Sequence, residues 1–263
     1  TQMPEFTVVA VNDLGSLENL EYLLKYDTVY GRFDKGLKGI RFLQEKDPSL
    51  LPWKELKVDI VVEATGMFES YEEARVHLRA GAKRVVITAP ATDKDTKDGK
   101  TVLVGVNEHD LAACRISSNG SCTTNAASSV IQVLNENPGI LKAVLNTSHG
   151  YTATQNLVDG PTRGKDVRRG RAAAQNIVPS STGAAIAVTR VIPALEGKFD
   201  GIALRIPLVT GSIADITFVA KRKTSVEEIN DILTKAASLP RWKGILKVTK
   251  DPIVSSDIIK EPY

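Results

Sequence analysis

Residues 58–90 contain the pattern that decides the fold: VDIVVEATGMFESYEEARVHLRAGAKRVVITAP. VDIVVEATG at the start and RVVITAP at the end are apolar runs rich in β-branched residues, as in buried strands. A helix is predicted between them, because Ser70 and Glu73 have the spacing of a capping box and Gly81 stands just past the helical pattern. Strand, helix and strand in this order predict a βαβ unit in a largely parallel sheet.

The same alternation extends to both sides of this unit. FTVVAVND (residues 6–13) indicates a strand, and SLENLEYLLKYD (16–27) indicates a helix with four leucines on one face. TVLVGVN (101–107) indicates a further strand after the polar loop 93–100. The first half of the chain is therefore expected to have an α/β fold.

The second half has a different order of elements. Strand-like runs occupy 143–148, 201–207 and 212–221, and a helical pattern with a capping box occupies 224–238. Strands gathered before a helix predict an α+β unit with a largely antiparallel sheet. The segment 152–175 has little periodicity, and a loop of this length is usually functional or disordered. We expect the boundary near Ser121, which gives domains of residues 1–121 and 122–263.

Composition narrows the function classes. Of 263 residues 42% are hydrophobic and 25% charged, which excludes global disorder and a collagen-like fibre. Lys+Arg 34 against Asp+Glu 31 leaves a net charge of +3, too even for nucleic acid as the primary partner. No apolar run is long enough for a membrane span, no metal site is expected, and the first residues lack the features of a secretory signal. Two cysteines fit a reducing compartment, so a cytoplasmic location is expected.

The strongest local signal is SNGSCTTN, residues 118–125, which stands where a polar turn meets a helix. The thiolate of Cys122 would be stabilised there by free backbone N–H groups and the helix dipole, which lowers the thiol pKa. The alternative is a small buried hydrophobic residue, the usual fate of a free cysteine. Cys114, between apolar neighbours, suits that alternative and is given no role.

His149 follows Cys122 by 27 residues, at the end of a predicted strand. This interval allows one helix and one strand to bring the imidazole back beside the thiol. A histidine within hydrogen-bond reach could hold the thiolate and later accept a proton. For His77, within a predicted helix, and His109, in a polar loop, the sequence indicates no partner.

Several groups suited to anions occur in the second half. They are Thr152, the run Arg168, Arg169 and Arg171, the turn SSTGAA at 180–185, and Arg205 within an apolar strand. Hydroxyls, N–H groups at a helix start and guanidinium forks suit phosphate oxygens. The arginine run could equally be a solvated loop or a weak nucleic-acid patch. Arg205 is harder to dismiss, since a lone charge inside an apolar strand needs a buried partner or a ligand.

Asp13 closes the predicted strand 6–13. In dinucleotide-binding folds an acidic residue at a strand end bonds the adenosine ribose and disfavours a 2′-phosphate, so it favours NAD over NADP. An Asp in this position is also a common turn residue.

Together these motifs resemble the phosphorylating glyceraldehyde-3-phosphate dehydrogenase family. The resemblance covers essentially the whole chain, through VNDL, LLKYDTVYGRF, EATGMF, GAKRVVITAP, SCTTN, TATQ, DGPTRGKDVRRGRAAAQNIVPSSTGAA, LRIP and VSSD. SCTTN with a histidine at this interval is highly specific. The resemblance implies a Rossmann-type NAD-binding domain over 1–121, incomplete here, and an α+β catalytic domain over 122–263.

The resemblance implies oxidative phosphorylation of glyceraldehyde 3-phosphate to 1,3-bisphosphoglycerate in glycolysis, with NAD as cofactor and inorganic phosphate as second substrate. Cys122 would form a thiohemiacetal and then a thioester, and His149 would act as base. Thr152 and Arg205 would hold the C3 phosphate of the substrate. The attacking phosphate would contact Ser121, Thr123, Thr182 and Gly183, with Arg169 nearby. NAD would contact Asp13, Leu14, Lys46, Thr65, Gly66 and Thr88, and Leu14 and Pro161 match the NAD-preferring pattern. A homotetramer is also implied.

The sequence departs from the family pattern in a few places. It lacks the first strand with its glycine-rich turn, a short stretch between Phe33 and Phe42, and the segment after Tyr263, and Ile186 stands where many relatives have lysine. We therefore expect the functional polypeptide to be longer than 263 residues. Two alternatives remain: a Cys/His acyl hydrolase or transferase, and a fragment that acts only as a binding module.

Overall fold

The computed structural model describes residues 5–162 and 164–263. Its N-terminal half is built on a four-stranded sheet, ordered β5-β6-β8-β7, in which every pair is parallel. The strands are β5 (Ile60–Glu63), β6 (Arg84–Ile87), β7 (Gly99–Thr101) and β8 (Ile116–Ser118). The predicted parallel sheet is confirmed, although sequence patterning did not indicate β8.

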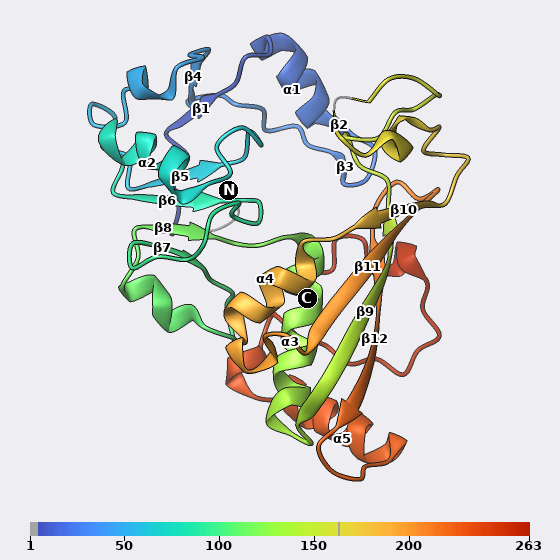
Figure 1. The fold of residues 1–263 in the computed structure, drawn as a ribbon. Coiled ribbons are helices and arrows are strands. Elements are labelled where there is room, and N and C mark those ends of the chain that lie inside the picture. The colour runs from blue at the N-terminus through green and yellow to red at the C-terminus, as the bar shows by residue number, and fades with distance from the viewer. Residues whose placement is uncertain (1–4, 163) are drawn as a thin grey trace.

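A second parallel pair, β1 (Ala10–Asn12) with β4 (Arg41–Leu43), lies above this sheet in Figure 1. The strand expected at 6–13 is wrong before Ala10, because only three residues of β4 are available as partners. The side chain of Phe6 is 56% exposed. Exposed and buried side chains alternate along β5, and Val62, on the uncovered face, is 63% exposed. A short hairpin joins β2 (Tyr26–Asp27) to β3 (Gly31–Arg32).

Two helices accompany these strands. The helix α2 (Tyr71–Arg79) has the expected capping box between Ser70 and Glu73, and Gly81 follows it with φ +112°. The helix α1 (Leu17–Lys25) is capped by Ser16 and buries none of its residues. Short 3-10 helices occupy Pro48–Leu50, Glu108–Ala112, Val167–Gly170, Pro193–Leu195, Pro240–Trp242 and Ser255–Ile258.

The strand expected at 101–107 is wrong beyond Thr101. Gly105 has φ +81°, which suits a turn and not a strand. The side chain of Asn107 fixes this turn, since its Oδ1 accepts the N–H of Leu103 and its Nδ2 donates to the carbonyl of Thr101. The chain therefore leaves the sheet at the end of β7 and turns back.

The C-terminal half is a mixed sheet of order β10-β11-β9-β12. Its strands are β9 (Ile140–Gly150), β10 (Val178–Ser181), β11 (Phe199–Ile206) and β12 (Ser212–Ala220). Two pairs are antiparallel and β11 runs parallel to β9. The sheet is thus largely antiparallel, as expected, with one parallel pair in its centre.

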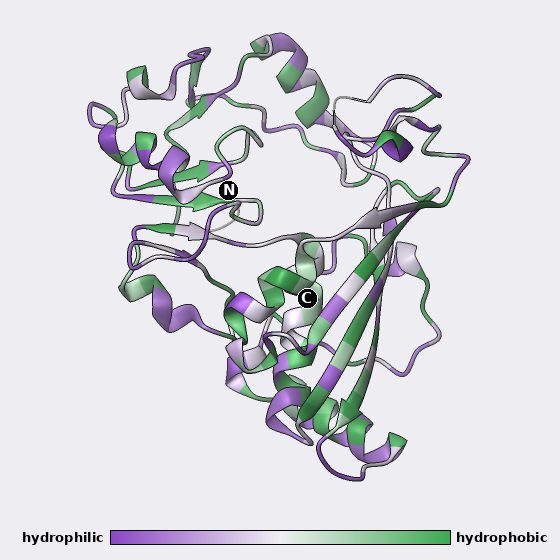
Figure 2. Cartoon of the chain, in the orientation of Figure 1, coloured by the Kyte–Doolittle hydropathy of each residue, from purple (hydrophilic) through white to green (hydrophobic). Residues whose placement is uncertain are grey.

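Three helices, α3 (Cys122–Glu136), α4 (Ala184–Val191) and α5 (Val226–Ala237), pack on one face of this sheet. Figure 2 shows hydrophobic residues along α3, α4 and the adjoining strands. The core includes Ile131, Leu145 and Val188, each 1% exposed or less. At α5 the expected capping box is half formed, because the carboxylate of Glu228 bonds Arg222 instead of the cap backbone.

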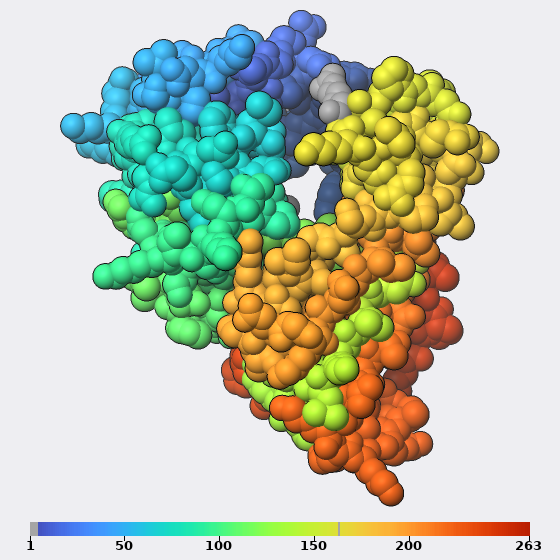
Figure 3. All heavy atoms as spheres, in the orientation of Figure 1, coloured from blue at the N-terminus to red at the C-terminus, as the bar shows by residue number. Residues whose placement is uncertain are grey.

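The two halves are joined through side chains on α4 and near the C-terminus. Arg190 donates from Nη1 to the carbonyl of Ala91 at 2.9 Å. Arg241 donates from Nε to the carbonyl of Gly105. Figure 3 shows an open gap between the N-terminal half and the loop 151–177, drawn in yellow. Within the described ranges, no helix has the length and hydropathy needed to cross a bilayer.

Candidate active site

Cys122 is the first residue of α3, and hydrogen bonds fix the loop that precedes it. Ser121 caps the helix: its hydroxyl accepts the N–H of Thr124, whose side chain accepts the N–H of Ser121. The amide of Asn125 donates to the carbonyls of Asn119 and Ser121, at 2.8 and 2.9 Å. The thiol is therefore held at a helix N-terminus, where free N–H groups favour a negative charge.

His149, near the end of β9, lies beside this thiol. Its Nε2 is 3.1 Å from Sγ of Cys122. The hydrogen bond with His149 lowers the pKa of Cys122 to about 7, against the opposing effect of burial, and the charge of His149 and the N–H of Thr123 add to the lowering. The same hydrogen bond raises the pKa of His149, against burial. The pair therefore favours thiolate and imidazolium near neutral pH.

Arg205 approaches the other side of the imidazole. In the parallel pairing of β11 with β9 it stands opposite His149, and its Nη1 lies 2.6 Å from Nδ1 of that ring. The same Nδ1 is 2.6 Å from the carbonyl oxygen of Gly150. These contacts exclude one another, since Nδ1 accepts from Arg205 when unprotonated and donates to Gly150 when protonated. Nη1 of Arg205 also donates to this carbonyl of Gly150, at 3.2 Å.

Arg205 and Arg169 lack acidic partners. Neither forms an ion pair within the described part of the chain, and the buried Nε of Arg205 has no hydrogen-bond partner there. Burial, followed by the nearby charge of Arg169, lowers the pKa of Arg205. A bound anion would compensate two neighbouring cations that have no carboxylate partner.

The arginine run divides into two kinds of residue. Arg168 pairs with Asp166 at 2.8 Å and Arg171 pairs with Asp159 at 3.0 Å, both on the exposed loop. Arg169 instead donates to the hydroxyls of Thr154 and Ser180, at 2.6 and 2.8 Å. Of the three arginines, only Arg169 is therefore directed toward the hydroxyls of Thr154 and Ser180.

The predicted phosphate ligands lie on segments that converge here. The hydroxyl of Thr152 is 3.1 Å from that of Thr154, a residue that sequence analysis did not single out. Thr182 accepts the N–H of Ala184 at 3.1 Å, and Gly183 caps α4. The turn expected at 180–185 is wrong at its start, because Ser180 and Ser181 pair with β11 as the end of β10. Ser121 and Thr123 flank the thiol, and Thr123 is 6% exposed.

The predicted cofactor residues follow the carboxyl ends of parallel strands. Asp13 follows β1, Gly66 and Thr65 follow β5, and Thr88 follows β6. The N–H of Asn119, three residues before the thiol, donates to the carbonyl of Ile87 at 3.0 Å. The end of β6 therefore lies directly beside the loop that holds Cys122. In parallel sheets dinucleotides bind at this edge.

The carboxylate of Asp13 is suited to a ribose. Its Oδ1 accepts the N–H of Gly15 at 2.7 Å, and its Oδ2 makes no hydrogen bond within the described residues. Leu14 is 62% exposed, and Lys46 is exposed without a hydrogen bond in the described ranges. The carboxylate of Asp13 and the ammonium group of Lys46 are an acceptor and a donor that fit the adenosine half of NAD.

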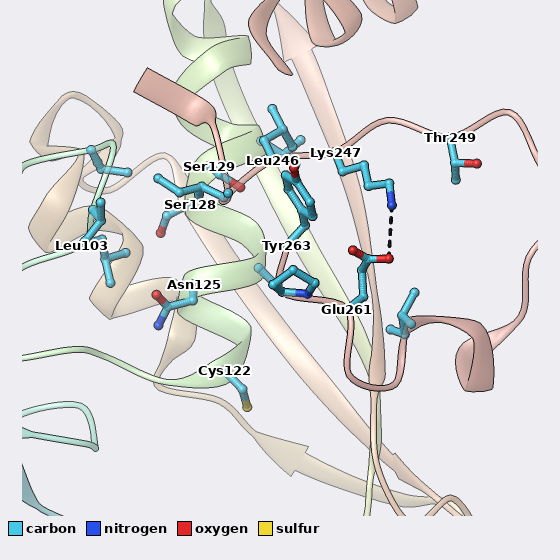
Figure 4. A pocket seen from close by; sticks show the side chains of 18 of the residues that line it. Leu103, Cys122, Asn125, Ser128, Ser129, Leu246, Lys247, Thr249, Glu261 and Tyr263 are labelled. Carbon is cyan, nitrogen blue, oxygen red and sulfur yellow. Dashed lines mark hydrogen bonds and ion pairs between the residues drawn. The ribbon is translucent and has the colours of Figure 1, made fainter. Parts of the chain in front are cut away.

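A cavity of about 720 Å³ opens beside Cys122 (Figure 4). It runs along α3 past Asn125 and Ser128 toward Tyr263. Cys122 stands at one end of this space, and its side chain is exposed, so small molecules can reach the thiol from solvent. Cys114, by contrast, is 2% exposed and free, as expected of a structural cysteine.

Sequence analysis indicated no partner for His77, but the structure gives it two. His77 is buried between Trp53 and Glu63, at 3.1 and 2.9 Å. The signal was present in the EATG motif, where an acidic residue in an apolar strand needs a buried donor.

Comparisons with known proteins agree with this geometry. The family model "Glyceraldehyde 3-phosphate dehydrogenase, C-terminal domain" matches residues 121–263, and the model for its NAD binding domain matches residues 1–71. Glyceraldehyde-3-phosphate dehydrogenase of Mycobacterium avium is 48% identical over 273 residues, which cover 98% of this chain and 78% of that protein. Glyceraldehyde-3-phosphate dehydrogenase of Streptomyces coelicolor is 44% identical over 274 residues, which cover 99% of this chain and 80% of that protein.

Proposed function

Since the chain belongs to the glyceraldehyde-3-phosphate dehydrogenase family, we propose that Cys122 and His149 carry its reaction. The protein is an NAD-dependent oxidoreductase that converts glyceraldehyde 3-phosphate and inorganic phosphate to 1,3-bisphosphoglycerate in glycolysis. One observation supports the assignment above all: the 3.1 Å contact between Sγ and Nε2 at the start of α3. It provides a thiolate and a proton carrier at the same point.

In the first step the Cys122 thiolate attacks the aldehyde carbon, and a C–S bond forms as the carbonyl π bond breaks. The His149 imidazolium transfers its Nε2 proton to the developing oxyanion, which becomes the hemithioacetal hydroxyl, and the neutral Nε2 then takes that proton back as base during the oxidation. NAD, when bound, supplies the hydride acceptor that makes the oxidation to a thioester possible. Asp13, Leu14, Lys46, Thr65, Gly66 and Thr88 would hold it.

In the second step inorganic phosphate attacks the thioester carbon. The C–S bond breaks, Cys122 leaves as a thiolate, and the product is an acyl phosphate. A low thiol pKa makes Cys122 a good leaving group as well as a nucleophile. A serine ester would retain less of the free energy of oxidation, so the chemistry requires sulfur.

Two phosphate sites follow from this sequence of steps. We assign the C3 phosphate of the substrate to Thr152 and Arg205, and the attacking phosphate to Ser121, Thr123, Thr182, Gly183 and Arg169. The unpartnered Nε of Arg205 supports the first assignment, since a phosphate oxygen would satisfy it. The hydrogen bond between Arg169 and Ser180 supports the second, because it holds the guanidinium near Thr182.

The alternatives are less well supported. A Cys/His hydrolase or transferase would leave Asp13 and both anion sites without a role, and the comparisons do not favour it. A nucleic-acid-binding loop would need free arginines, whereas Arg168 and Arg171 are paired with acidic residues.

We also propose the domain division 1–121 and 122–263, a homotetramer and a cytoplasmic location. A change from the parallel sheet to the mixed sheet at α3 supports the division. The sheet face opposite α3 exposes Val144, Ile202 and Ile213 by 55%, 58% and 66%, and an apolar face of this kind suits contact with another subunit. Both cysteines are free, which fits a reducing compartment.

The decisive assay is NADH formation on addition of glyceraldehyde 3-phosphate. The proposed function predicts sustained turnover only when inorganic phosphate is present. Release of a free acid at the same rate without phosphate would support the hydrolase instead.

A further inference from the structure

Glu63, His77 and Trp53 form a buried hydrogen-bond network beneath the proposed cofactor cleft. These residues are 5%, 3% and 6% exposed. Nε1 of Trp53 lies 3.1 Å from Nδ1 of His77, and Nε2 of His77 lies 2.9 Å from Oε2 of Glu63. An indole N–H can only donate, so Nδ1 accepts and Nε2 carries the proton that is donated to Glu63. The network therefore has one direction, from Trp53 through His77 to the carboxylate.

The other groups of Glu63 hold the segments that follow β5 and β6. Its Oε1 accepts the N–H of Thr65 at 2.8 Å and also the Thr65 hydroxyl, whose oxygen accepts the N–H of Met67 at 3.1 Å. Its backbone carbonyl accepts the N–H and the hydroxyl of Thr88, at 3.0 and 3.2 Å. Glu63 thus contacts both threonines, Thr65 through its carboxylate and Thr88 through its backbone carbonyl.

The carboxylate depends on His77 to keep this arrangement. Burial alone would raise the pKa of Glu63, but hydrogen bonds from His77 and Thr65 outweigh burial and keep the pKa below its usual value. If the donor at Oε2 were lost, a buried carboxylate oxygen would have no partner. The side chain would then turn or admit water, and the turn at Thr65 would lose its support.

We propose that His77 is a positioning residue of the cofactor site, which holds the carboxylate of Glu63 in the orientation that fixes Thr65. The inference rests on the proposed assignment of Thr65 to the NAD cleft. His77 is too deeply buried to touch the cofactor, and it acts through Glu63.

Calorimetric titration of the intact enzyme with NAD tests this role. His77→Leu is expected to raise the Kd for NAD roughly tenfold, the effect of losing one hydrogen bond to a charged group. The KM for glyceraldehyde 3-phosphate should stay within about twofold of the wild-type value, because the lost hydrogen bond is remote from the substrate site. His77→Gln, which retains an N–H donor, should recover most of the affinity.

Tyr71→Phe is the matched control. Tyr71 is 1% exposed on the same helix, and its hydroxyl bonds Asp95 and Thr101, away from the cleft. The Tyr71→Phe substitution should lower the Tm without changing the Kd for NAD. An equal change of Kd in His77→Leu and Tyr71→Phe, at an equal loss of Tm, would reduce His77 to a structural residue.

Trp53→Phe keeps the test decisive if His77→Leu does not fold. It removes only the donor to Nδ1, so nitrogen NMR of His77 should change from a single tautomer to a mixture, and NAD affinity should fall. A wild-type ring with its proton on Nδ1 would overturn the inference. Thr65→Val separates the cleft assignment from the positioning role of His77. Unchanged NAD affinity in Thr65→Val would contradict the assignment of Thr65 to the cleft. Weakened affinity in Thr65→Val, together with unchanged affinity in His77→Leu, would overturn the positioning role alone.

Discussion

The sulfur of Cys122 lies 3.1 Å from Nε2 of His149, although the two residues stand 27 positions apart. The helix α3 leads away from the thiol and β9 returns to it, so the imidazole arrives at the helix N-terminus. This return places the acidic proton of the pair between sulfur and nitrogen.

Replacement of the nucleophile should abolish turnover. Cys122→Ser is expected to lower the rate of NADH formation by a factor on the order of 10³ or more, because a serine hydroxyl at neutral pH is a far weaker nucleophile. Cys114→Ser, at the buried free cysteine, is the control and should keep its rate. Near-normal turnover by Cys122→Ser would remove the thiol from the mechanism.

The pH dependence of thiol labelling should report the pair. Iodoacetamide reacts with the thiolate, so labelling of Cys122 should rise with pH around a midpoint of about 7. In His149→Asn the midpoint should move up toward the ordinary thiol value of about 8.5, because the main cause of the low pKa is gone. A midpoint that does not move would show that His149 has no part in activating the sulfur.

Arg205 should matter for phosphorylated substrate. Arg205→Leu is expected to raise the KM for glyceraldehyde 3-phosphate by roughly 10- to 100-fold, the value of one or two charge-assisted hydrogen bonds. Activity with unphosphorylated glyceraldehyde should change little by comparison. Arg168→Leu, at an arginine paired with Asp166, is the control. Equal losses with both aldehydes would place Arg205 in general support of His149.

Asp13 should set the choice of cofactor. Asp13→Gly removes a carboxylate that repels the 2′-phosphate of NADP, so the ratio of kcat/KM for NAD over NADP should fall. Asp47→Asn changes an exposed carboxylate that caps the nearby turn at Pro48, and it should leave the ratio unchanged. If the ratio in Asp13→Gly equals that of the wild type, Asp13 is only the turn residue that bonds Gly15.

The exposed sheet face should carry subunit contacts. Ile213→Glu adds a charge where β12 presents a 66% exposed isoleucine opposite Ser148 of β9. Sedimentation should show a shift from tetramer to smaller species. Lys221→Glu, in the turn beyond β12, is the control: it also introduces a glutamate and changes the net charge by two instead of one. A tetramer that persists in Ile213→Glu would place the interface elsewhere.

Local pattern predicted the parts of the fold in which sequence and packing agree. The capping box at Ser70 and the alternation in β12 are examples, because both arise from neighbours in the sequence. Strand 101–107 failed because Val102 and Leu103 look like strand residues, whereas the side chain of Asn107 closes a turn. Strand β8 was missed because its ISS sequence is short and polar, and only pairing on both sides makes it a strand.

The same division holds at the candidate site. Cys122 and His149 could be predicted from the sequence, because the SCTTN motif and the 27-residue interval are local features. Thr154 and His77 could not, because their partners, Arg169 and Glu63, are distant in the sequence and are brought near only by the fold. The pairing of Arg168 with Asp166, which separates it from Arg169, likewise needs the loop conformation.

The most direct test of the central claim is mass spectrometry of the enzyme after mixing with NAD and glyceraldehyde 3-phosphate in the absence of inorganic phosphate. The account predicts one NADH per active site and a phosphoglyceroyl thioester on the peptide that contains Cys122, which disappears when phosphate is added. No adduct, or an adduct on another residue that forms and decays at the catalytic rate, would contradict it.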